Sequence, residues 1–423
     1  MKKKPQLKKI RHIISSGGNS LSYFFKENNT VIKESIMALL ISAIGGLIAG
    51  VILGNMTSFL EAFPGLMVLI PGAIGMRGNI FGALGSRLGS HLHIGLIRPK
   101  FEKSDVLTEN ILSSFILTII LSVFLAFLAK GLCIILNFES MSLLDFTLIS
   151  MFAGIISSAI MLPITMFISL KSFKHGWDPD NVSTPIIAAF GDLFTLPSII
   201  IAIFMTSFFS HFLLKYSLFI IAIILTLTGF IYGIRSHGEM RKIIRQSTPV
   251  LLLSSALGVS AGGFLNSSIT TLLNNPSLLT LIPLFSGESG NLVSVLGARL
   301  SSALHTGLID PVLKPEKTIL RNFAIVIVLS ILIFPIIGFL AESSSVVLGL
   351  PGLGFIEMIS ISTIAGMVLI AIMLLVVFYI SAISYRKGFD PDNIVIPIST
   401  STTDSISSLI LISISLLVLH GIL

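Results

Sequence analysis

Two aspartates lie deep in apolar segments, at matching places in the two halves of the chain. Asp192 ends the stretch DPDNVSTPIIAAFGD, and Asp404 ends the stretch DPDNIVIPISTSTTD. Each stretch opens with Asp-Pro, which favours a helix start because an acid can cap the helix and proline suits its first turn. At about 1.5 Å per residue, each aspartate then lies on the order of 20 Å along its helix.

The chemistry that such a pair suits is cation binding. An ionised carboxylate inside a bilayer is costly, so it faces a bundle interior or a water-filled cavity. Two carboxylates across a shared axis repel each other unless a cation lies between them. Mg²⁺ prefers oxygen ligands and keeps several of its waters. We therefore predict a divalent-cation site with Asp192 and Asp404 as central metal ligands; the competing interpretation is an acid that only bonds a neighbouring helix.

Further polar residues share the helical face of these aspartates. Spacings of four, three and four residues connect Asn181 to Asp192 and, equally, Asn393 to Asp404. The acids of the DPDN sequences lie where each helix begins. Helix capping is favoured for the first acid of each sequence, and metal binding is considered equally with capping for the second. The candidates are Asp178, Asp180, Asn181, Asp390, Asp392, Asn393 and Thr400.

A second repeated motif, GxxGN, follows a proline in the middle of an apolar segment. It occupies residues 75–79 and 287–291. Glycine and proline permit a broken or bent helix, whose exposed carbonyls would be tolerated only beside protein or a water-filled cavity. Asn79 and Asn291 are predicted as metal ligands, with capping of a broken helix as the alternative. Further candidates for the pathway lining are Gly78, Gly290 and Glu288, although Glu288 could instead form an ion pair with Arg77.

The elements that must position these residues are membrane-spanning helices. The chain has 53% hydrophobic and 11% charged residues, whereas soluble domains have about 25% charged residues. Apolar runs of about twenty residues, enough to cross roughly 30 Å of hydrocarbon, recur throughout. We predict an all-α polytopic membrane protein with spans near 34–56, 60–96, 106–137, 145–171, 180–212, 216–235, 247–272, 278–307, 318–342, 354–384 and 392–421.

The chain is an internal duplication. Residues 71–99 match residues 283–311 at 15 of 29 positions, and the same shift superimposes the DPDN sequences and the two aspartates. We predict two five-helix repeats that a single extra helix joins. Because that extra span restores the direction of the chain, the repeats should be parallel and related by a pseudo-twofold axis along the membrane normal. The predicted divisions are a basic cytoplasmic tail at 1–33, repeats at 34–212 and 243–423, and a linker helix at 213–242.

The net charge of +7 follows a membrane-topology pattern, so a nucleic-acid partner is not expected. Lys and Arg gather in the N-terminal tail and in alternate connections, and they are absent from the turns GNMTSFLEAF, NFESMS, NNPS and AESSS. We expect a multi-pass protein of the cell membrane, in contact with its lipids, with a cytoplasmic N-terminus and an outside C-terminus. One cysteine, Cys133, excludes a CxxC metal or redox site.

The GN and DPDN motifs resemble those of MgtE-type magnesium transporters, in particular the eukaryotic solute carriers that carry this five-span domain twice. The resemblance covers both halves and implies Mg²⁺ passage along their interface, with Asp192 and Asp404 as the central site and Asn79 and Asn291 as the GN positions. Mn²⁺ and Co²⁺ are further candidate ions. For the acids of the DPDN sequences, the resemblance implies a vestibule role at the cytoplasmic mouth. No segment of this sequence is long enough for the cytoplasmic regulatory domains of MgtE, so gating by such domains is not expected here.

Mg²⁺ is expected as transported ion, without an organic cofactor or enzymatic activity, and one chain could hold a complete pathway. Two other interpretations stay open. The acids could be Na⁺ or H⁺ sites of a transporter of another substrate. Less favoured is a Mg-dependent membrane enzyme, because such an enzyme would need acids clustered near the interface.

Overall fold

The apolar segments form long helices because a backbone in hydrocarbon must satisfy its own hydrogen bonds. The computed structural model describes residues 4–93, 95–97, 104–175, 184–209, 211–387 and 391–421, all helices and connections without strands. Within them, 11 helices are long and apolar enough to span a membrane, which confirms the predicted number of spans. In chain order the helices are α1 (Lys4–Gly54), α2 (Thr57–Ala62), α3 (Leu66–His93), α4 (Asp105–Ile135), α5 (Leu143–Lys174), α6 (Thr184–Phe208), α7 (Phe212–Arg235), α8 (Gly238–Asn266), α9 (Ile269–Asn274), α10 (Pro276–His305), α11 (Lys317–Leu348), α12 (Phe355–Arg386) and α13 (Pro391–Leu419).

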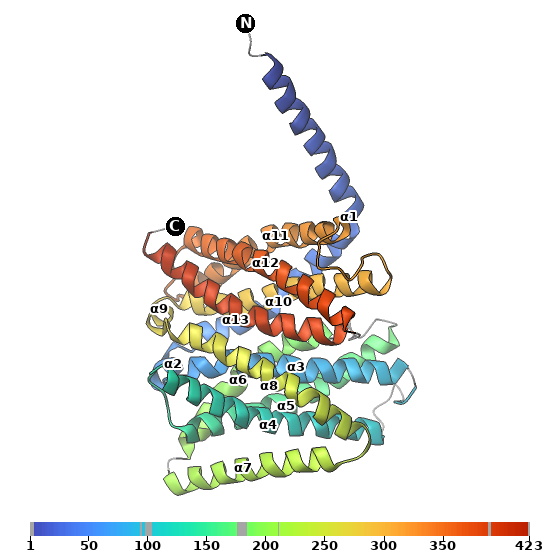
Figure 1. Cartoon of the computed structure of the whole chain (residues 1–423). Coiled ribbons are helices and arrows are strands. Elements are labelled where there is room, and N and C mark those ends of the chain that lie inside the picture. The colour runs from blue at the N-terminus through green and yellow to red at the C-terminus, as the bar shows by residue number, and fades with distance from the viewer. Residues whose placement is uncertain are drawn as a thin grey trace.

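The helices differ from the predicted segments in three respects. The short helices α2 and α9 follow α1 and α8 and were not predicted. The segment of α1 that can span the membrane is Val31–Gly54, and the earlier part of the helix projects from the bundle (Figure 1). At these prolines the sequence permits a broken or a bent helix; the break is wrong, because α3 continues through Pro71 and α10 through Pro283, and the bend stays a prediction. A proline removes one backbone N–H, and a helix packed on several sides can absorb that loss.

The repeats pack as a pseudo-symmetric pair, as the parallel duplication predicts. Helices α3 to α6 contact one another in the same pattern as α10 to α13, and α7 lies at the edge of the bundle against α4, α5 and α8 (Figure 1). The first helix of each repeat packs against the other repeat: α1 lies along α10, and α8 lies along α3. The two repeats are therefore interlocked by their first helices.

Small residues allow these exchanged helices to approach closely. A Cβ at Gly50 of α1 would overlap the carbonyl oxygen of Thr280 in α10, and a Cβ at Gly262 of α8 would overlap that of Val68 in α3. Small residues at helical spacing are typical contacts between membrane helices, because they let two backbones approach closely. The close approach brings α1 and α8 against the two helices that carry the GN motifs.

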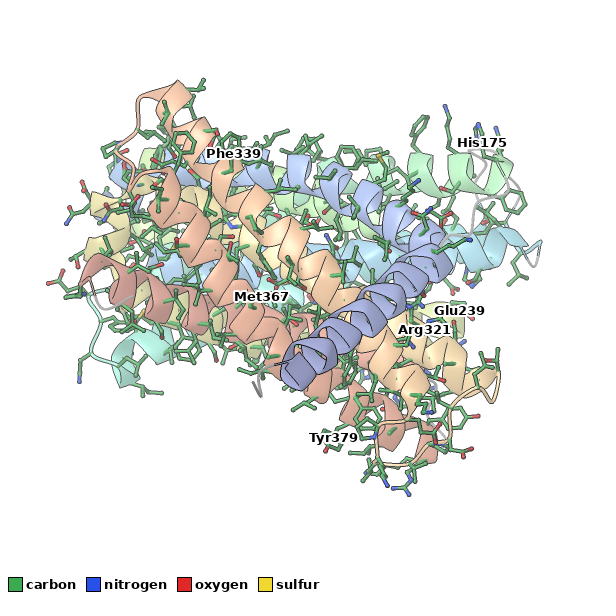
Figure 2. All side chains as sticks on the ribbon, turned by 90° about the horizontal axis from the view of Figure 1, so that it is seen from above. His175, Glu239, Arg321, Phe339, Met367 and Tyr379 are labelled. Atoms are coloured by element: carbon green, nitrogen blue, oxygen red, sulfur yellow. The ribbon has the colours of Figure 1, made fainter. Side chains whose placement is uncertain are left out.

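Polar contacts hold α8 at its N-terminus and α1 just before its membrane-spanning segment. One oxygen of Glu109 in α4 accepts the N–H groups of Glu239 and Met240 at the start of α8, at 2.8 and 3.3 Å. At the matching place in the second repeat, Arg321 of α11 donates to Asn28 of α1 at 2.8 and 3.0 Å, beside that helix in Figure 2. A carboxylate at a helix N-terminus satisfies otherwise unpaired donors and complements the helix dipole.

The cap on α8 gives a stability prediction. Glu109→Ala should destabilise the protein by about 0.5–2 kcal/mol, the usual cost of losing a capping side chain. Lys215→Ala is the comparison, because it removes the half-buried Lys215–Asp145 ion pair at the edge of the bundle, where the loss should stay below about 1 kcal/mol. Thermal unfolding midpoints of the purified variants measure both, and a Glu109→Ala midpoint equal to the wild type would contradict the capping role.

Candidate cation site

The two predicted acids belong to helices of different repeats and interact electrostatically. Asp192 lies in α6 and Asp404 in α13; both are partly buried, and their carboxyl groups lie close enough to interact electrostatically. Ser286 of α10 donates to Asp404 Oδ1 at 2.7 Å. Asp404 Oδ2 lies 3.7 Å from the position that a Cβ would take at Gly75 of α3. The second repeat's acid therefore reaches the GN helix of the first.

Asp192 differs from its counterpart in having no such hydrogen bond. It forms none with any residue that the structure describes, and neither acid pairs with a described lysine or arginine. The residue matching Ser286 in the first repeat is Ile74, which explains the difference. An uncompensated pair of acids in a bilayer needs positive charge between them. The arrangement suits a cation, with one acid held in place and the other free to adjust.

Close helix packing places Asp192 beside the first GN motif. A Cβ at Gly191 would lie 3.3 Å from the backbone nitrogen of Gly78, so α6 and α3 touch backbone to backbone there. The next residue along α6 is Asp192. In the second repeat, no described atom lies within 4 Å of a Cβ placed at Gly287 or Gly290, so this part of α10 faces space that the described residues leave open. Such space at membrane depth suits a pathway lining.

The asparagines of the two GN motifs are oriented by serines of the exchanged helices. Asn79 Nδ2 donates to Ser254 of α8 at 2.6 Å, and Ser254 bonds Ser401 of α13 at 2.7 Å. Asn291 Nδ2 donates to Ser42 of α1 at 2.7 Å. Because each amide nitrogen already donates to a serine, the side-chain oxygen is the atom that could bind a cation. Hydrogen bonds of this kind orient metal ligands.

Sequence reasoning missed these two serines. Ser42 and Ser254 are separated by the same 212 positions as the repeated motifs, so the duplication could have revealed them. Nothing in the sequence, however, showed that α1 and α8 cross to the opposite repeat. The fold supplies that information.

Glu288 and Arg77 do not form the ion pair that was considered as an alternative. Glu288 is 1% exposed and its Oε1 accepts from Asn291 Nδ2 at 3.4 Å, while Arg77 donates through Nε to Ser157 of α5 at 2.6 Å. The pairing hypothesis is wrong because the two side chains enter different helix interfaces. Glu288 adds a carboxyl group beside the second GN motif only, since Met76 occupies its place in the first repeat.

Of the polar residues predicted along the face of the two aspartates, only Thr400 has a described side chain. Thr400 lies in α13 one turn before Asp404 and is partly buried. Asp392 and Asn393 fall in the first turn of α13, but their side chains lie outside the described part. Asp178, Asp180, Asn181 and Asp390 lie outside the described residues altogether. Their roles stay predictions.

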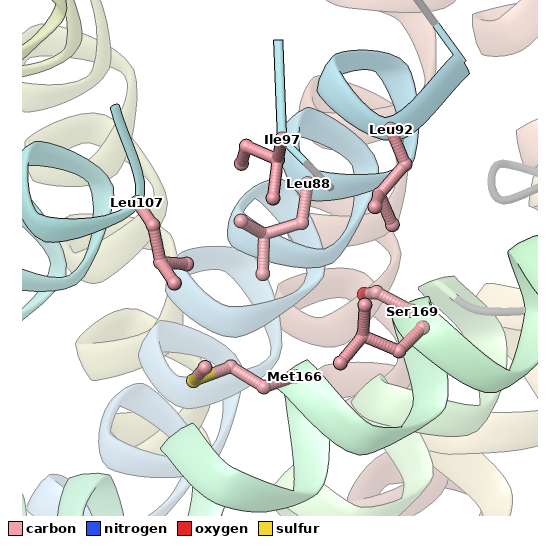
Figure 3. Close-up of a pocket in the computed structure, with 7 residues that line it drawn as sticks. Leu88, Leu92, Ile97, Leu107, Met166 and Ser169 are labelled. Atoms are coloured by element: carbon pink, nitrogen blue, oxygen red, sulfur yellow. The ribbon is translucent and has the colours of Figure 1, made fainter. Parts of the chain in front are cut away.

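The donor set is one of oxygens, without a cluster of acids. Among the described residues there is no group of three or more His, Cys, Asp or Glu side chains that could hold a metal. Mg²⁺ often uses one or two carboxylates and keeps its remaining waters, so two acids and two amide oxygens fit this ion. A separate pocket between α3, α4 and α5 is lined by Leu88, Leu92, Leu107 and other mainly apolar side chains, with Ser169 as its polar member (Figure 3). Its apolar lining does not suit a cation.

Comparisons with known proteins identify the family of the chain. The sequence profile of the MgtE family, described as a divalent cation transporter, matches residues 70–202 and 282–414, which is more than half of the chain. The rat (Rattus norvegicus) solute carrier family 41 member 3 is 24% identical over 417 residues, covering 90% of this chain and 87% of the relative. Solute carrier family 41 member 2 of Mus musculus and of Homo sapiens is 28% identical over 296 residues.

The match to the two member 2 proteins covers 66% of this chain and 50% of theirs, so the chain spans about half of their length. No solved structure gives a significant match. The two segments that the family profile matches contain Asn79 with Asp192 and Asn291 with Asp404. The chain therefore belongs to the MgtE family of divalent cation transporters, whose domain it carries twice.

Proposed function

We propose that this protein carries Mg²⁺ across the membrane along the interface of its two repeats. The observation that carries the proposal is the pair of unneutralised acids, Asp192 and Asp404, which the duplication brings into electrostatic range between the GN helices. A divalent cation supplies the two positive charges that this pair needs, and no described basic side chain supplies them.

The described residues suggest how an ion could be held and released. Asp404, fixed by Ser286, gives one carboxylate of constant position. Asp192, without a hydrogen bond in the described part, can move with the ion. The side-chain oxygens of Asn79 and Asn291 add neutral ligands, and retained waters complete the shell. A small number of protein ligands keeps binding weak enough for release, which conduction requires.

Three finer features belong to the same proposal. The acids of the DPDN sequences would concentrate cations at a cytoplasmic vestibule, with the N-terminus on that side and the C-terminus outside. Mn²⁺ and Co²⁺, which also take oxygen ligands, would compete with Mg²⁺. One chain would suffice for transport, because both repeats contribute to a single site.

The experiment is Mg²⁺ influx into proteoliposomes that enclose a magnesium-sensitive dye. The wild-type protein should give influx above that of protein-free liposomes when Mg²⁺ is added outside. Sodium and proton gradients imposed one at a time separate passive conduction from coupled transport. Absence of Mg²⁺ influx under every gradient, from protein that elutes as a single folded species, would overturn the proposal and favour another substrate.

The serines that orient the GN asparagines should affect this influx without destroying it. Ser254→Ala removes the acceptor of Asn79 Nδ2, and Ser42→Ala removes that of Asn291. Loss of such a supporting bond typically costs about 10–100-fold in metal affinity or activity. Ser343→Ala is the matched control, since this exposed hydroxyl bonds only a carbonyl of its own helix. Influx in the Ser254 variant equal to that of the control would remove Asn79 from the site.

A further inference from the structure

A second polar site lies on the other side of the first GN helix. Arg77 of α3 is 0% exposed, and its guanidinium lies against α4 and α5. Its Nε donates to Ser157, but Nη1 and Nη2 are both buried without a partner. The hydroxyl of Ser122 in α4 is also buried and without a partner. The cation mechanism uses none of these groups.

The charge of Arg77 has no counter-charge among the described residues. A guanidinium stays protonated in proteins, so burial cannot remove its charge. An unpaired charge in an apolar interior is far too costly to leave uncompensated. No described acid forms an ion pair with Arg77. In the neighbouring helices, Glu109 of α4 accepts hydrogen bonds from the start of α8, and Asp145 of α5 is paired with Lys215. The compensating charge must come from outside the described side chains.

The groups around Arg77 are suited to donate hydrogen bonds. Nη1 and Nη2 carry free N–H groups, and the Ser122 hydroxyl can add an O–H. A second hydroxyl pair, Thr118 with Ser158 at 3.0 Å, borders the site. Gly154 contributes no side chain, and a Cβ there would lie 3.0 Å from Nη2 and overlap Ser122 Oγ. Only a small ligand suits such a place, and a set of donors with a fixed positive charge selects an anion.

The second repeat shows that the fold does not require this site. Ser289, Phe334 and Leu369 stand at the positions of Arg77, Ser122 and Ser157. A Cβ at Gly366, the counterpart of Gly154, would overlap the Phe334 ring, so an aromatic side chain fills the space. One repeat thus places a charge and two hydroxyls where the other places one hydroxyl, an aromatic ring and a leucine.

We propose that the first repeat binds one small inorganic anion, such as chloride, between Arg77 and Ser122 at the junction of α3, α4 and α5. The anion neutralises Arg77 and joins α3, which carries Asn79, to the two helices behind it. This site is separate from the cation pathway, and its occupation stabilises the folded chain, as any ligand of the native state does.

The test is a chloride titration of the full-length protein in detergent. Sodium gluconate is replaced by sodium chloride at constant ionic strength, and the thermal unfolding midpoint is followed by size-exclusion chromatography. The wild-type midpoint should rise with chloride and reach a plateau. The rise should disappear in Arg77→Ser, which introduces the residue that the second repeat has at this position. In Ser122→Ala the rise should require a higher chloride concentration. Ser289→Ala is the matched control in the second repeat and should respond as the wild type does.

Two results would overturn the proposal: a wild-type midpoint that does not depend on chloride, or the same plateau in the wild type and both variants. If Arg77→Ser does not fold, the chloride responses of Ser122→Ala and Gly154→Ala test the proposal, because both substitutions alter the site and leave the charge of Arg77 in place. Because the readout is binding, it is independent of whether Mg²⁺ is transported.

Discussion

Asp192→Asn and Asp404→Asn should each lower Mg²⁺ influx into proteoliposomes by at least about tenfold. Asparagine keeps the size and one oxygen of the side chain but removes the negative charge, so a single acid would face a divalent ion. Loss of a group that merely supports a metal ligand costs about 10–100-fold, and loss of a charged ligand should cost no less. Asp404→Asn retains an oxygen for Ser286, so its fold should be unchanged.

The control for these variants is Asp145→Asn, which changes an acid already paired with Lys215 at the edge of the bundle. It should transport as the wild type does. If Asp192→Asn and Asp404→Asn fold and also transport normally, the pair is structural and the pathway lies elsewhere. The double variant tests whether the acids act together: in a shared site, the second substitution should add less than the first.

Gly50→Ala and Gly262→Ala should each destabilise the protein by about 1–3 kcal/mol, the usual cost of overpacking a tight contact. The added methyl group would overlap a backbone carbonyl of the facing helix, which cannot move aside as a flexible side chain could. Because these glycines lie between α1 and α10 and between α8 and α3, each substitution weakens the interlock of the repeats. Thermal unfolding midpoints in detergent measure the effect.

Gly131→Ala is the control for this series. Gly131 also lies within a helix, but nothing lies within 4 Å of a Cβ placed there. Alanine favours helix over glycine by about 0.8–1.0 kcal/mol, so this variant should be as stable as the wild type or more so. If Gly50→Ala behaves like Gly131→Ala, the close packing of the exchanged helices is wrong.

Much of this architecture could be predicted from the sequence because its signals are strong. Apolar length sets the number of spans, the 212-residue shift of the motifs sets the duplication, and the extra span between the repeats sets their parallel arrangement. The equivalence of Asp192 and Asp404 follows from the same shift. Each of these inferences rests on periodicity or composition, which a single sequence displays directly.

The packing partners could not be predicted in this way. Apolar helices in a bilayer are driven together by fit and not by a hydrophobic pattern, so nothing along the chain shows that α1 lies on α10. The continuity of α3 through Pro71 depends on the surrounding helices, so the sequence could not decide between a broken, a bent and a continuous helix. The orientation of Arg77 towards Ser157 and away from Glu288 likewise depends on which interface each side chain enters.

The most direct test of the central claim is anomalous diffraction from crystals of the protein soaked in Mn²⁺, an oxygen-preferring divalent ion that can stand in for Mg²⁺. The paired-acid site predicts an anomalous peak between the carboxyl groups of Asp192 and Asp404, and none there in the Asp192→Asn variant. Mn²⁺ bound only elsewhere, with these two carboxyl groups bonded to protein atoms instead, would contradict it.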